Sequence, residues 1–329
     1  MKNVMVTGGA GFIGVQLLKK LLTIKLDKII VIDNLSNMNK RFNDILNSDS
    51  NNKLSFYKAD IRNKQEILDI IKDGHIDTCI HLAAIVSVLD SIVNPDYTVD
   101  VNINGTFNVL DACSRSGVKN FIFSSSCAVY GESNELPLSE NDPLTPFSPY
   151  GASKAAGEAL VSSYGRMKKI QNAISLRFFN VYGENQNPQY AGVITKFIER
   201  LSKGLAPTIF GDGEQTRDFI HVGDVVDAII SASSFKHDIK DLDAANNWRS
   251  LSTTFNVGTG HPTSINRLAD KLIEIFGPNL KPIFTNMVDG EMKHCYANTE
   301  KSRKFLNFVA KENFESNLPQ MVDHTICSR

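Results

Sequence analysis

A glycine-rich turn directly after the first apolar run constrains the fold of this chain more than any other feature. The apolar run Asn3–Thr7 is followed by Gly-Gly-Ala-Gly-Phe-Ile-Gly, and a helical pattern extends from Phe12 to Leu26. Glycines at this spacing permit a tight turn and let the pyrophosphate of a dinucleotide approach the backbone at the helix N-terminus. The residues predicted to contact the dinucleotide here are Gly8, Gly11, Phe12, Ile13 and Gly14.

An acidic residue ends the second β-branched run and narrows the choice of dinucleotide. Asp33 closes the run Lys28–Asp33, 19 residues after Gly14. A carboxylate at this place accepts a hydrogen bond from a ribose hydroxyl and repels a 2′-phosphate, which favours NAD over NADP. The alternative is a purely structural glycine turn with a capping Asp. Further cofactor contacts are predicted at Asn34, Asp60, Ile61, Leu82, Ala83 and Ala84, whereas His81 is predicted to be a satisfied core histidine.

Short apolar runs alternate with helical patterns over the first part of the chain. This order predicts a doubly wound α/β fold of the Rossmann type, with a parallel sheet and right-handed crossovers. The predicted strands are residues 3–7, 28–33, 54–59, 78–82, 120–124 and 173–178, and the predicted helices are residues 12–26, 64–72, 97–116 and 149–168.

The pattern becomes looser in the second part of the chain. Helices are predicted at residues 192–203 and 266–276, and a polar surface loop at residues 236–250. We expect a NAD-binding Rossmann domain that comprises residues 1–179 and a returning segment, residues 219–260. A smaller C-terminal α/β domain, residues 180–218 and 261–329, is expected to bind the substrate over the carboxyl ends of the strands.

Charge and cysteine content argue against several other classes of protein. The formal net charge is −1, which gives no basic excess for nucleic acid binding, and the seven histidines show no metal-ligand spacing. Five cysteines without a Cys-x-x-Cys pair argue against a disulfide framework and favour a reducing compartment. No apolar run approaches the roughly 20 residues that span a bilayer. We therefore expect a cytoplasmic protein with no metal site and no membrane or nucleic acid partner.

A Tyr-x-x-x-Lys pair opens the fourth predicted helix. Ser148 has the features of an N-cap, so Tyr150 and Lys154 lie one turn apart on the same face. A phenol is a poor base at neutral pH, but a nearby ammonium and a positively charged nicotinamide would stabilise its phenolate. Such a pair in isolation is usually an exposed helix contact. Here the triplet Ser124–Ser126 ends the preceding strand, at the edge where doubly wound sheets bind their ligands.

The order of these motifs resembles that of the extended short-chain dehydrogenase/reductase family, in particular its nucleotide-sugar epimerases and dehydratases. The resemblance covers nearly the whole chain, through the blocks TGGAGFIG, DIRN, HLAA, NINGT, SSSCAVYG, SPYGASK, LRFFNVYG, GDGEQTRDFIHVGDV and TFNVGTG. It implies a sheet of about seven strands, a tightly held NAD and a nucleoside-diphosphate sugar as substrate. It also implies a homodimer formed through the helices at residues 97–116 and 149–168.

The resemblance also assigns roles to individual residues. It implies that Tyr150 is the acid/base, that Lys154 is its partner and a ligand of the cofactor ribose, and that Ser126 is the third catalytic residue. Asn102 and Phe179 are implied to line the nicotinamide. The residues implied to contact the sugar, the phosphates or the base are Ser87, Ser126, Asn180, Val193, Phe210, Arg217, Lys293 and Cys295.

Two departures from the family pattern bear on the reaction. The 4,6-dehydratases of the family need an Asp-Glu pair after the catalytic residue, where this chain has Cys127 and Ala128. This comparison leaves 4-epimerisation, which needs only removal and return of a hydride, with UDP-glucose and UDP-galactose as the implied substrates. Val288 stands where the family usually has an arginine that binds the diphosphate, and Lys293 is a candidate replacement.

The identity of the sugar stays open at this point. Cys295 occupies a position at which a large side chain limits the sugar pocket of the family, so its small thiol predicts that N-acetyl sugars are accepted. An ordinary core cysteine is the alternative. The activity could also be that of a UDP-glucuronate 4-epimerase or of another nucleotide-sugar oxidoreductase. A non-catalytic NAD-binding regulator is a further alternative, although a pure binder has no need of Ser126, Tyr150 and Lys154.

Overall fold

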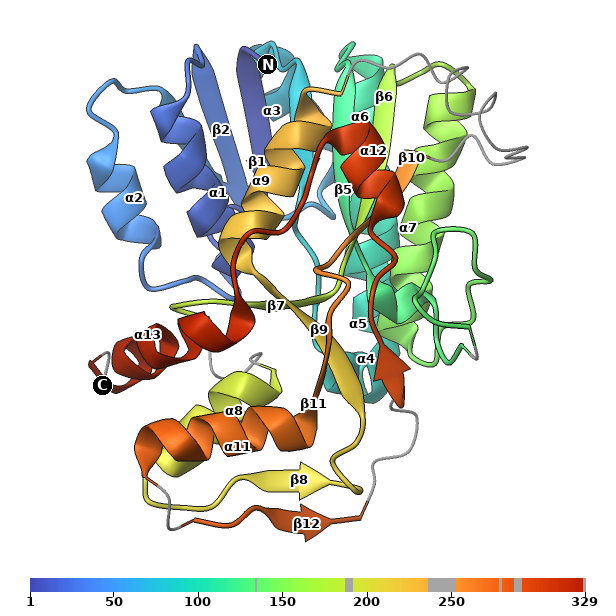
Figure 1. Ribbon diagram of the computed structural model, residues 1–329. Coiled ribbons are helices and arrows are strands. Elements are labelled where there is room, and N and C mark those ends of the chain that lie inside the picture. Colours follow the sequence, from blue (N-terminus) through green and yellow to red (C-terminus); the bar gives the residue numbers. More distant parts are fainter. Residues whose placement is uncertain (134, 187–191, 236–252, 278–279, 287–291, 328–329) are drawn as a thin grey trace.

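A parallel sheet of seven strands dominates the computed structural model, which describes residues 1–133, 135–186, 192–235, 253–277, 280–286 and 292–327 (Figure 1). The strand order is β10-β6-β5-β4-β1-β2-β3, and all neighbours are parallel. This confirms the predicted doubly wound α/β fold. The strands are β1 Asn3–Thr7, β2 Lys28–Asp33, β3 Leu54–Lys58, β4 Thr78–His81, β5 Asn120–Ser126, β6 Asn172–Phe178 and β10 Thr253–Val257.

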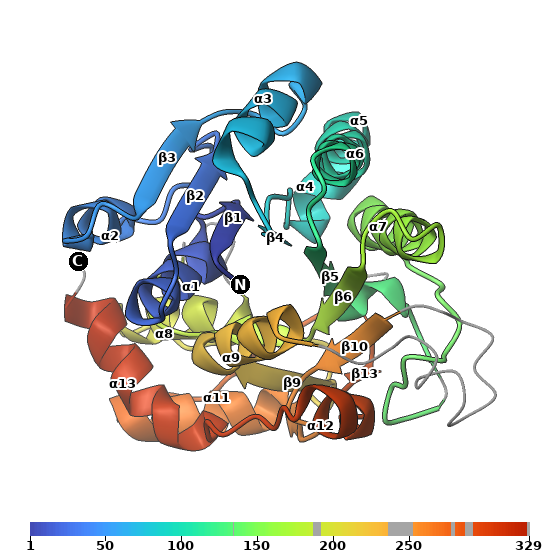
Figure 2. The same ribbon diagram turned by 90° about the horizontal axis from the view of Figure 1, so that it is seen from above.

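Helices cover both faces of this sheet (Figure 2). Successive side chains of a strand point to opposite faces, so Val4 and Val6 pack in one core cluster and Met5 in another. The first cluster includes residues of α1 (Phe12–Thr23) and α9 (Val222–Ser233). The second lies under α3 (Lys64–Gly74), α6 (Thr106–Arg115) and α7 (Pro149–Arg166). Because both faces are buried, strands such as β2 are apolar runs without alternation, which is why the sequence shows them clearly. Strand β10, with the sequence Thr-Thr-Phe-Asn-Val, was not among the predicted strands.

The helix predicted at residues 97–116 is interrupted. It consists of α5 (Pro95–Val99), a π-helical segment at Asp100–Gly105 and α6. The wider turn encloses Asn102, whose buried side chain binds the backbone of Ile85. Such π-helical insertions often occur beside functional sites, and an apolar period alone does not reveal them. Two short helices, α2 (Phe42–Ser48) and α4 (Val88–Val93), are additions that the sequence did not predict.

A smaller layer covers the carboxyl ends of the strands. One sheet combines β7 (Asn180–Tyr182), β9 (Thr216–His221), β11 (Pro262–Ser264) and β13 (His294–Cys295), and a second pairs β8 (Thr208–Phe210) with β12 (Ile283–Thr285). Its helices are α8 (Val193–Leu201), α11 (Ile265–Phe276) and α13 (Phe314–Cys327), whereas α12 (Glu300–Leu306) packs beside the large sheet, against α9 and β10. Of these, α8 and α11 confirm the predicted helices, and the layer has its own apolar core.

The path of the chain places a crevice between the two layers. In the large sheet β1 lies between β2 and β4, so the connections leave β1 and β4 in opposite directions along the sheet. Ligands of doubly wound folds bind at the carboxyl ends of the strands at this point. The predicted polar loop at residues 236–250 lies outside the described residues, and the exact domain boundaries stay a prediction. None of the described helices has the length and apolar character needed to cross a bilayer.

Candidate active site

The glycine-rich turn joins β1 to α1 and lies against the end of β4. Gly8 has a φ of 71°, in the left-handed region that favours glycine, and a Cβ there would lie 2.6 Å from the Ala83 nitrogen. A Cβ on Gly14 would lie 2.4 Å from the Gly8 carbonyl oxygen. Neither Cβ could be accommodated without a shift of the backbone. The turn therefore packs closely against the first residues of α1 and leaves the space on its other side open.

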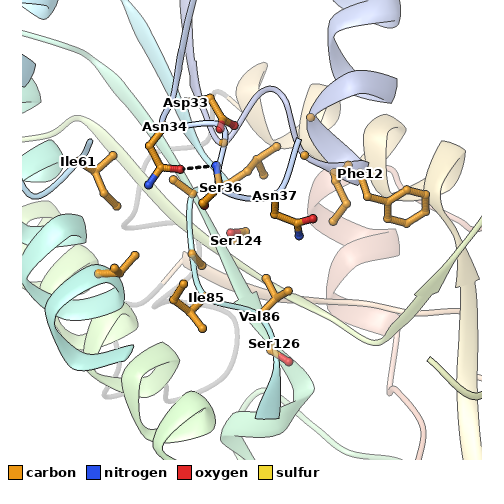
Figure 3. Close-up of a pocket in the computed structure, with 18 of the residues that line it drawn as sticks. Phe12, Asp33, Asn34, Ser36, Asn37, Ile61, Ile85, Val86, Ser124 and Ser126 are labelled. Carbon is orange, nitrogen blue, oxygen red and sulfur yellow. Dashed lines mark hydrogen bonds between the residues drawn. The ribbon is translucent and has the colours of Figure 1, made fainter. Parts of the chain in front are cut away.

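That space is a cavity of about 310 Å³ along the carboxyl edge of the large sheet (Figure 3). Figure 3 shows Asp33 and Asn34 at one end of it and Ser126 at the other. The glycine backbone suits a pyrophosphate, and the carboxylates suit ribose hydroxyls, so these residues fit a dinucleotide. The residues predicted to contact NAD that line the cavity are Gly8, Gly11, Phe12, Ile13, Gly14, Asp33, Asn34, Asp60, Ile61, Leu82, Ala83, Ala84, Tyr150, Lys154 and Phe179.

The two carboxylates of the cavity are in different environments. Asp33 accepts hydrogen bonds from the backbone N–H groups of Ala10 at 3.0 Å and Leu35 at 2.8 Å, while burial raises its pKa. Asp60 is paired with the Arg62 guanidinium, whose hydrogen bonds lower the pKa of Asp60 to about 2. Asp33 thereby fixes the position of the glycine-rich turn relative to β2, in addition to any contact with a ribose.

Sequence reasoning missed part of the cavity wall. After Asp33 the chain continues with Ser36, Asn37 and Asn39, which all line the cavity, as does Gln186 from the segment after β7. The Asn34 side chain orders this stretch, since its Oδ1 accepts a hydrogen bond from the Ser36 N–H at 3.0 Å (Figure 3). The small polar residues that directly follow Asp33 could have indicated that this segment lines the cavity.

Two residues near the cavity are engaged by the protein itself. His81 is buried, with Thr7 Oγ1 at 2.6 Å from Nδ1 and Thr106 Oγ1 at 2.9 Å from Nε2, which confirms a satisfied core histidine. Burial lowers its pKa to about 3. Asn102 donates to the carbonyl of Ile85 at 3.0 Å and to Ser153 Oγ at 2.9 Å, and it does not line the cavity. Its contact with NAD stays a prediction.

Tyr150 and Lys154 lie on the first turns of α7, beside the end of β5. Ser148 caps this helix and accepts a hydrogen bond from the Gly151 N–H at 3.1 Å, which confirms the predicted N-cap. The buried Lys154 Nζ donates to the Ser124 carbonyl at 2.8 Å and lies 5.9 Å from the centroid of the Tyr150 ring. Together with Ser126, these side chains line one end of the cavity.

The electrostatics of this group are governed by burial. Burial raises the pKa of Tyr150 to about 12, and a hydrogen bond with Ser126 opposes this shift. Burial also lowers the pKa of Lys154 to about 7, and the negative charge of Glu158 opposes that shift. The sequence led us to expect that the ammonium would favour the phenolate. The structure adds that burial disfavours both the Tyr150 phenolate and the Lys154 ammonium, so each needs an opposite charge nearby.

The residues predicted to contact the sugar nucleotide lie in the smaller layer or at its edge. Arg217 on β9 and Cys295 on β13 are register partners, and Asn180 lies on β7, which also pairs with β9. Arg217 is buried and its Nη1 donates to the Thr216 carbonyl at 2.9 Å. The other positions are Ser87 at the N-cap of α4, Val193 at the start of α8, Phe210 at the exposed end of β8, and the exposed Lys293. Val288 lies outside the described residues.

Two observations bear on the predicted sugar residues Asn180 and Cys295. Asn180 Nδ2 is buried and has no hydrogen-bond partner among the described residues, so an oxygen of a ligand would satisfy it. Cys127, the residue after Ser126, hydrogen bonds through its thiol with Cys295, which lowers the pKa of Cys127. The contact places Cys295 beside the end of β5. The contacts of the predicted sugar residues with a substrate stay a prediction.

Comparison with known proteins agrees with this geometry. Residues 4–247 match the model of the NAD dependent epimerase/dehydratase family. A Methanocaldococcus jannaschii protein, provisionally named UDP-glucose 4-epimerase, is 40% identical over 301 residues, which cover 91% of this chain and 90% of that protein. The structure of a UDP-N-acetylglucosamine 4-epimerase from Methanobrevibacter ruminantium in complex with UDP-N-acetylmuramic acid has a TM-score of 0.87, with 33% identity over 100% of this chain and 99% of that one. A Thermus thermophilus UDP-glucose 4-epimerase in complex with NAD has a TM-score of 0.84, with 31% identity over 100% of both chains.

Proposed function

The chain belongs to the NAD dependent epimerase/dehydratase family, and we propose that it is an isomerase that interconverts UDP-hexoses differing in configuration at C4. The observation that carries this proposal is the group of Ser126, Tyr150 and Lys154 at one end of a cavity that fits a dinucleotide. The next residues are Cys127 and Ala128, which offer no carboxyl group for an elimination of water. Removal and return of hydride at C4 is the reaction that remains.

The cavity residues would hold NAD through the backbone of the glycine-rich turn and through Asp33 and Asp60. NAD supplies reversible acceptance of a hydride from C4 of the sugar, so no cofactor is consumed in a full cycle. The negative charge of Asp33 disfavours the 2′-phosphate of NADP. Lys154 would bind a ribose hydroxyl of the cofactor in addition to its contact with Ser124.

Tyr150 moves the proton of the C4 hydroxyl. Its phenol, with a pKa raised to about 12 by burial, becomes a base only when positive charge stabilises the phenolate. The Lys154 ammonium, 5.9 Å from the centroid of the ring, supplies part of this charge. Ser126 hydrogen bonds with Tyr150 and would orient the reacting oxygen at the same time. When hydride returns to the 4-keto sugar, Tyr150 gives the proton back.

The UDP part of the substrate is proposed to bind at the small sheet. The Arg217 guanidinium is suited to hold a diphosphate as a bidentate donor, and the unsatisfied Asn180 Nδ2 would donate to an oxygen beside it. Ser87 and Lys293 would add polar contacts, and Val193 and Phe210 apolar contacts to the base and the ribose. A diphosphate held in this way leaves the hexose free to turn, which a 4-epimerase requires because both faces of C4 have to react.

Cys295 is proposed to set the size of the sugar pocket, because its buried thiol contacts Cys127 beside the catalytic group. A tyrosine there would fill the space that an N-acetyl group needs. We expect Cys295→Tyr to lower turnover of UDP-GlcNAc by about tenfold or more relative to UDP-glucose. Thermal unfolding and NAD content show whether the variant is folded. Unchanged turnover of UDP-GlcNAc in folded protein would refute this assignment.

We further propose that the protein acts as a cytoplasmic homodimer joined through α5, α6 and α7. Apolar side chains are exposed on or beside these helices, including Val93, Val99 and Phe107. Cys79, Cys113, Cys127 and Cys295 are buried and form no disulfide, which fits a reducing compartment. Light scattering of the purified protein tests the dimer, and Phe107→Glu would weaken it.

The deciding experiment uses purified protein with UDP-glucose or UDP-GlcNAc and no added NAD, followed by proton NMR of the anomeric signals. We expect the galacto-configured product to appear and to stop at an equilibrium mixture. A steady rise in absorbance at 340 nm with added NAD would instead indicate a net oxidoreductase. A folded, NAD-containing protein that converts neither sugar nor UDP-glucuronate would rule out the proposed reaction.

A further inference from the structure

Helix α7 carries a buried carboxylate one turn beyond Lys154. Tyr150, Lys154 and Glu158 follow one another at intervals of four residues and lie on one side of the helix. Glu158 is 6% exposed. Ser125 Oγ donates to its Oε1 at 2.5 Å, and Arg177 donates from Nε to Oε1 at 2.9 Å and from Nη2 to Oε2 at 2.7 Å. The carboxylate is therefore fixed by a bidentate pair and a hydroxyl.

The ammonium of Lys154 lacks such a partner. Within the described part of the chain, its Nζ forms no ion pair; it donates to the Ser124 carbonyl and lies 5.1 Å from the centroid of the Phe123 ring. Burial lowers the pKa of Lys154 to about 7, and the charge of Glu158 is the influence that raises it. An ammonium with this pKa is partly neutral under physiological conditions, although the proposed chemistry needs its charge.

Among the groups described around Lys154, Glu158 is the one that raises its pKa. His81 on β4 is neutral, because burial and then the charge of Lys154 lower its pKa to about 3. Tyr150 on the same helix keeps its proton, since burial raises its pKa to about 12. The Cys127 thiol, whose pKa is lowered, acts on Tyr150 and raises the pKa of that phenol, and Arg177 on β6 adds positive charge behind Glu158. Among these groups, Glu158 is the carboxylate that offsets the burial of Lys154.

Arg177 is itself held from several sides. Its Nη1 donates to the Glu140 carbonyl at 3.3 Å, and its guanidinium lies 4.6 Å from the centroid of the Tyr130 ring. Tyr130 in turn donates from its hydroxyl to Asn256 Oδ1 at 2.6 Å, on β10. Glu158 thus lies at the end of a network that spans β5, β6 and β10. This network holds its carboxylate in one position beside α7.

We propose that Glu158 is a positioning residue for the reaction: its carboxylate, fixed by Arg177 and Ser125, keeps the Lys154 ammonium charged within the buried site. The charged ammonium then lowers the free energy of the Tyr150 phenolate. The role of Tyr150 in this inference rests on the proposed function. The effect of Glu158 on the charge of Lys154 does not depend on it. The competing explanation is that the ion pair only ties α7 to β6, as buried ion pairs often do without a net gain in stability.

The test reads the charge of Lys154 directly and needs no substrate. In protein labelled with ¹³C at lysine Cε, the Lys154 signal is assigned by its absence in Lys154→Met and followed over pH by NMR. We expect Glu158→Gln to lower the apparent pKa of Lys154 by about one unit or more, and Glu158→Asp to restore most of the difference. An unchanged titration in folded Glu158→Gln would overturn the inference.

A second variant separates charge from folding. Glu158→Gln leaves Arg177 buried without its partner, so it could fail to fold, whereas Glu158→Gln combined with Arg177→Met removes both buried charges. If the pair were only structural, the double variant would titrate like the wild type. We expect the pKa of Lys154 in the double variant to stay below that of the wild type. The loss of kcat at high pH should then begin at lower pH than in the wild type. At a pH above both Lys154 pKa values, kcat should be up to about tenfold lower than in the wild type. A shifted Lys154 titration in protein that converts no UDP-sugar would refute the proposed function and support this inference.

Discussion

The large parallel sheet and the small sheet hold their functional residues by different means. On the NAD side, meaning the turns after β1 to β5 together with α7, each functional residue directly follows or neighbours a strand of four to seven residues. On the sugar side, meaning β7, β9, β11 and β13 with their connections, three of the strands have only two or three residues. Long ladders fix the first side, so the second needs individual side chains to fix it.

Asp218 illustrates how the sugar side is held. It is fully buried on β9, next to Arg217, and its Oδ1 accepts hydrogen bonds from the Thr259 N–H at 2.8 Å and the Thr259 hydroxyl at 2.6 Å. Its Oδ2 accepts from the N–H groups of Gly260 at 2.9 Å and Ala297 at 3.1 Å. One carboxylate thus ties β9 to the turn after β10 and to the segment after β13. Such dependence on a single residue makes this side sensitive to point changes.

The largest effect is expected where the two sides meet, at Tyr150. Tyr150→Phe removes the hydroxyl that we propose moves the proton and changes no backbone contact of either side, so kcat should fall by about 10²–10⁴-fold. NAD content, thermal unfolding and binding of UDP-sugar should stay close to those of the wild type. Anomeric proton NMR measures the rate and absorbance of the denatured extract measures NAD. Full activity of this variant would refute the assignment of the acid/base.

The NAD side could be predicted from sequence because local patterns determine it. The turn from Gly8 to Gly14, the acid Asp33 at a strand end and the Tyr150–Lys154 spacing each depend on residues close together in the chain. The register of a parallel sheet then brings the strand ends to one edge without further information. What the sequence did not indicate is the electrostatic cost, because the burial of Lys154 depends on how α7 packs against β5.

The sugar side could not be derived from local patterns. Strands such as β13, with two residues, give no periodicity, and the pairing of Arg217 with Cys295 joins segments 78 positions apart. Resemblance to a family supplied the candidate residues there, and the structure supplied the contacts that hold them. The Asp218 network is of the same kind, because its partners come from two distant segments, at Thr259–Gly260 and at Ala297. A buried Asp is also not distinguishable from an exposed one in sequence.

Asp218→Asn tests whether the two sides are held independently. An amide keeps one acceptor but presents N–H donors to N–H groups, which should cost about 2 kcal/mol of stability. We expect KM for the UDP-sugar to rise by about tenfold, with a smaller change in kcat and unchanged NAD content. Asp270→Asn, at an exposed position of α11 in the same layer, is the matched control. If Asp218→Asn lost NAD to the same degree as it lost binding of UDP-sugar, the NAD side and the sugar side would not be held independently.

The smallest effect is expected at Asn39, which links the two sides. Its backbone N–H donates to the Ala10 carbonyl in the glycine-rich turn at 2.7 Å, and its side chain donates to the carbonyl of Asn185, after β7, at 2.8 Å. Asn39→Ala removes the second bond and also the Oδ1 atom that accepts a hydrogen bond from the Arg41 N–H at 2.9 Å. The bond to Asn185 is worth about 1 kcal/mol, so release of NAD should become about fivefold faster.

The matched control for Asn39→Ala is Asn185→Gly, which keeps the carbonyl acceptor and tolerates the φ of 63° at this position. Release of NAD is followed by its exchange against labelled NAD in both variants and in the wild type. If Asn39→Ala releases NAD faster than the wild type and Asn185→Gly does not, a contact from the sugar side retains the cofactor. Equal release from all three would mean that the NAD side holds its ligand by itself, because the turn and Asp33 then account for the whole of the retention.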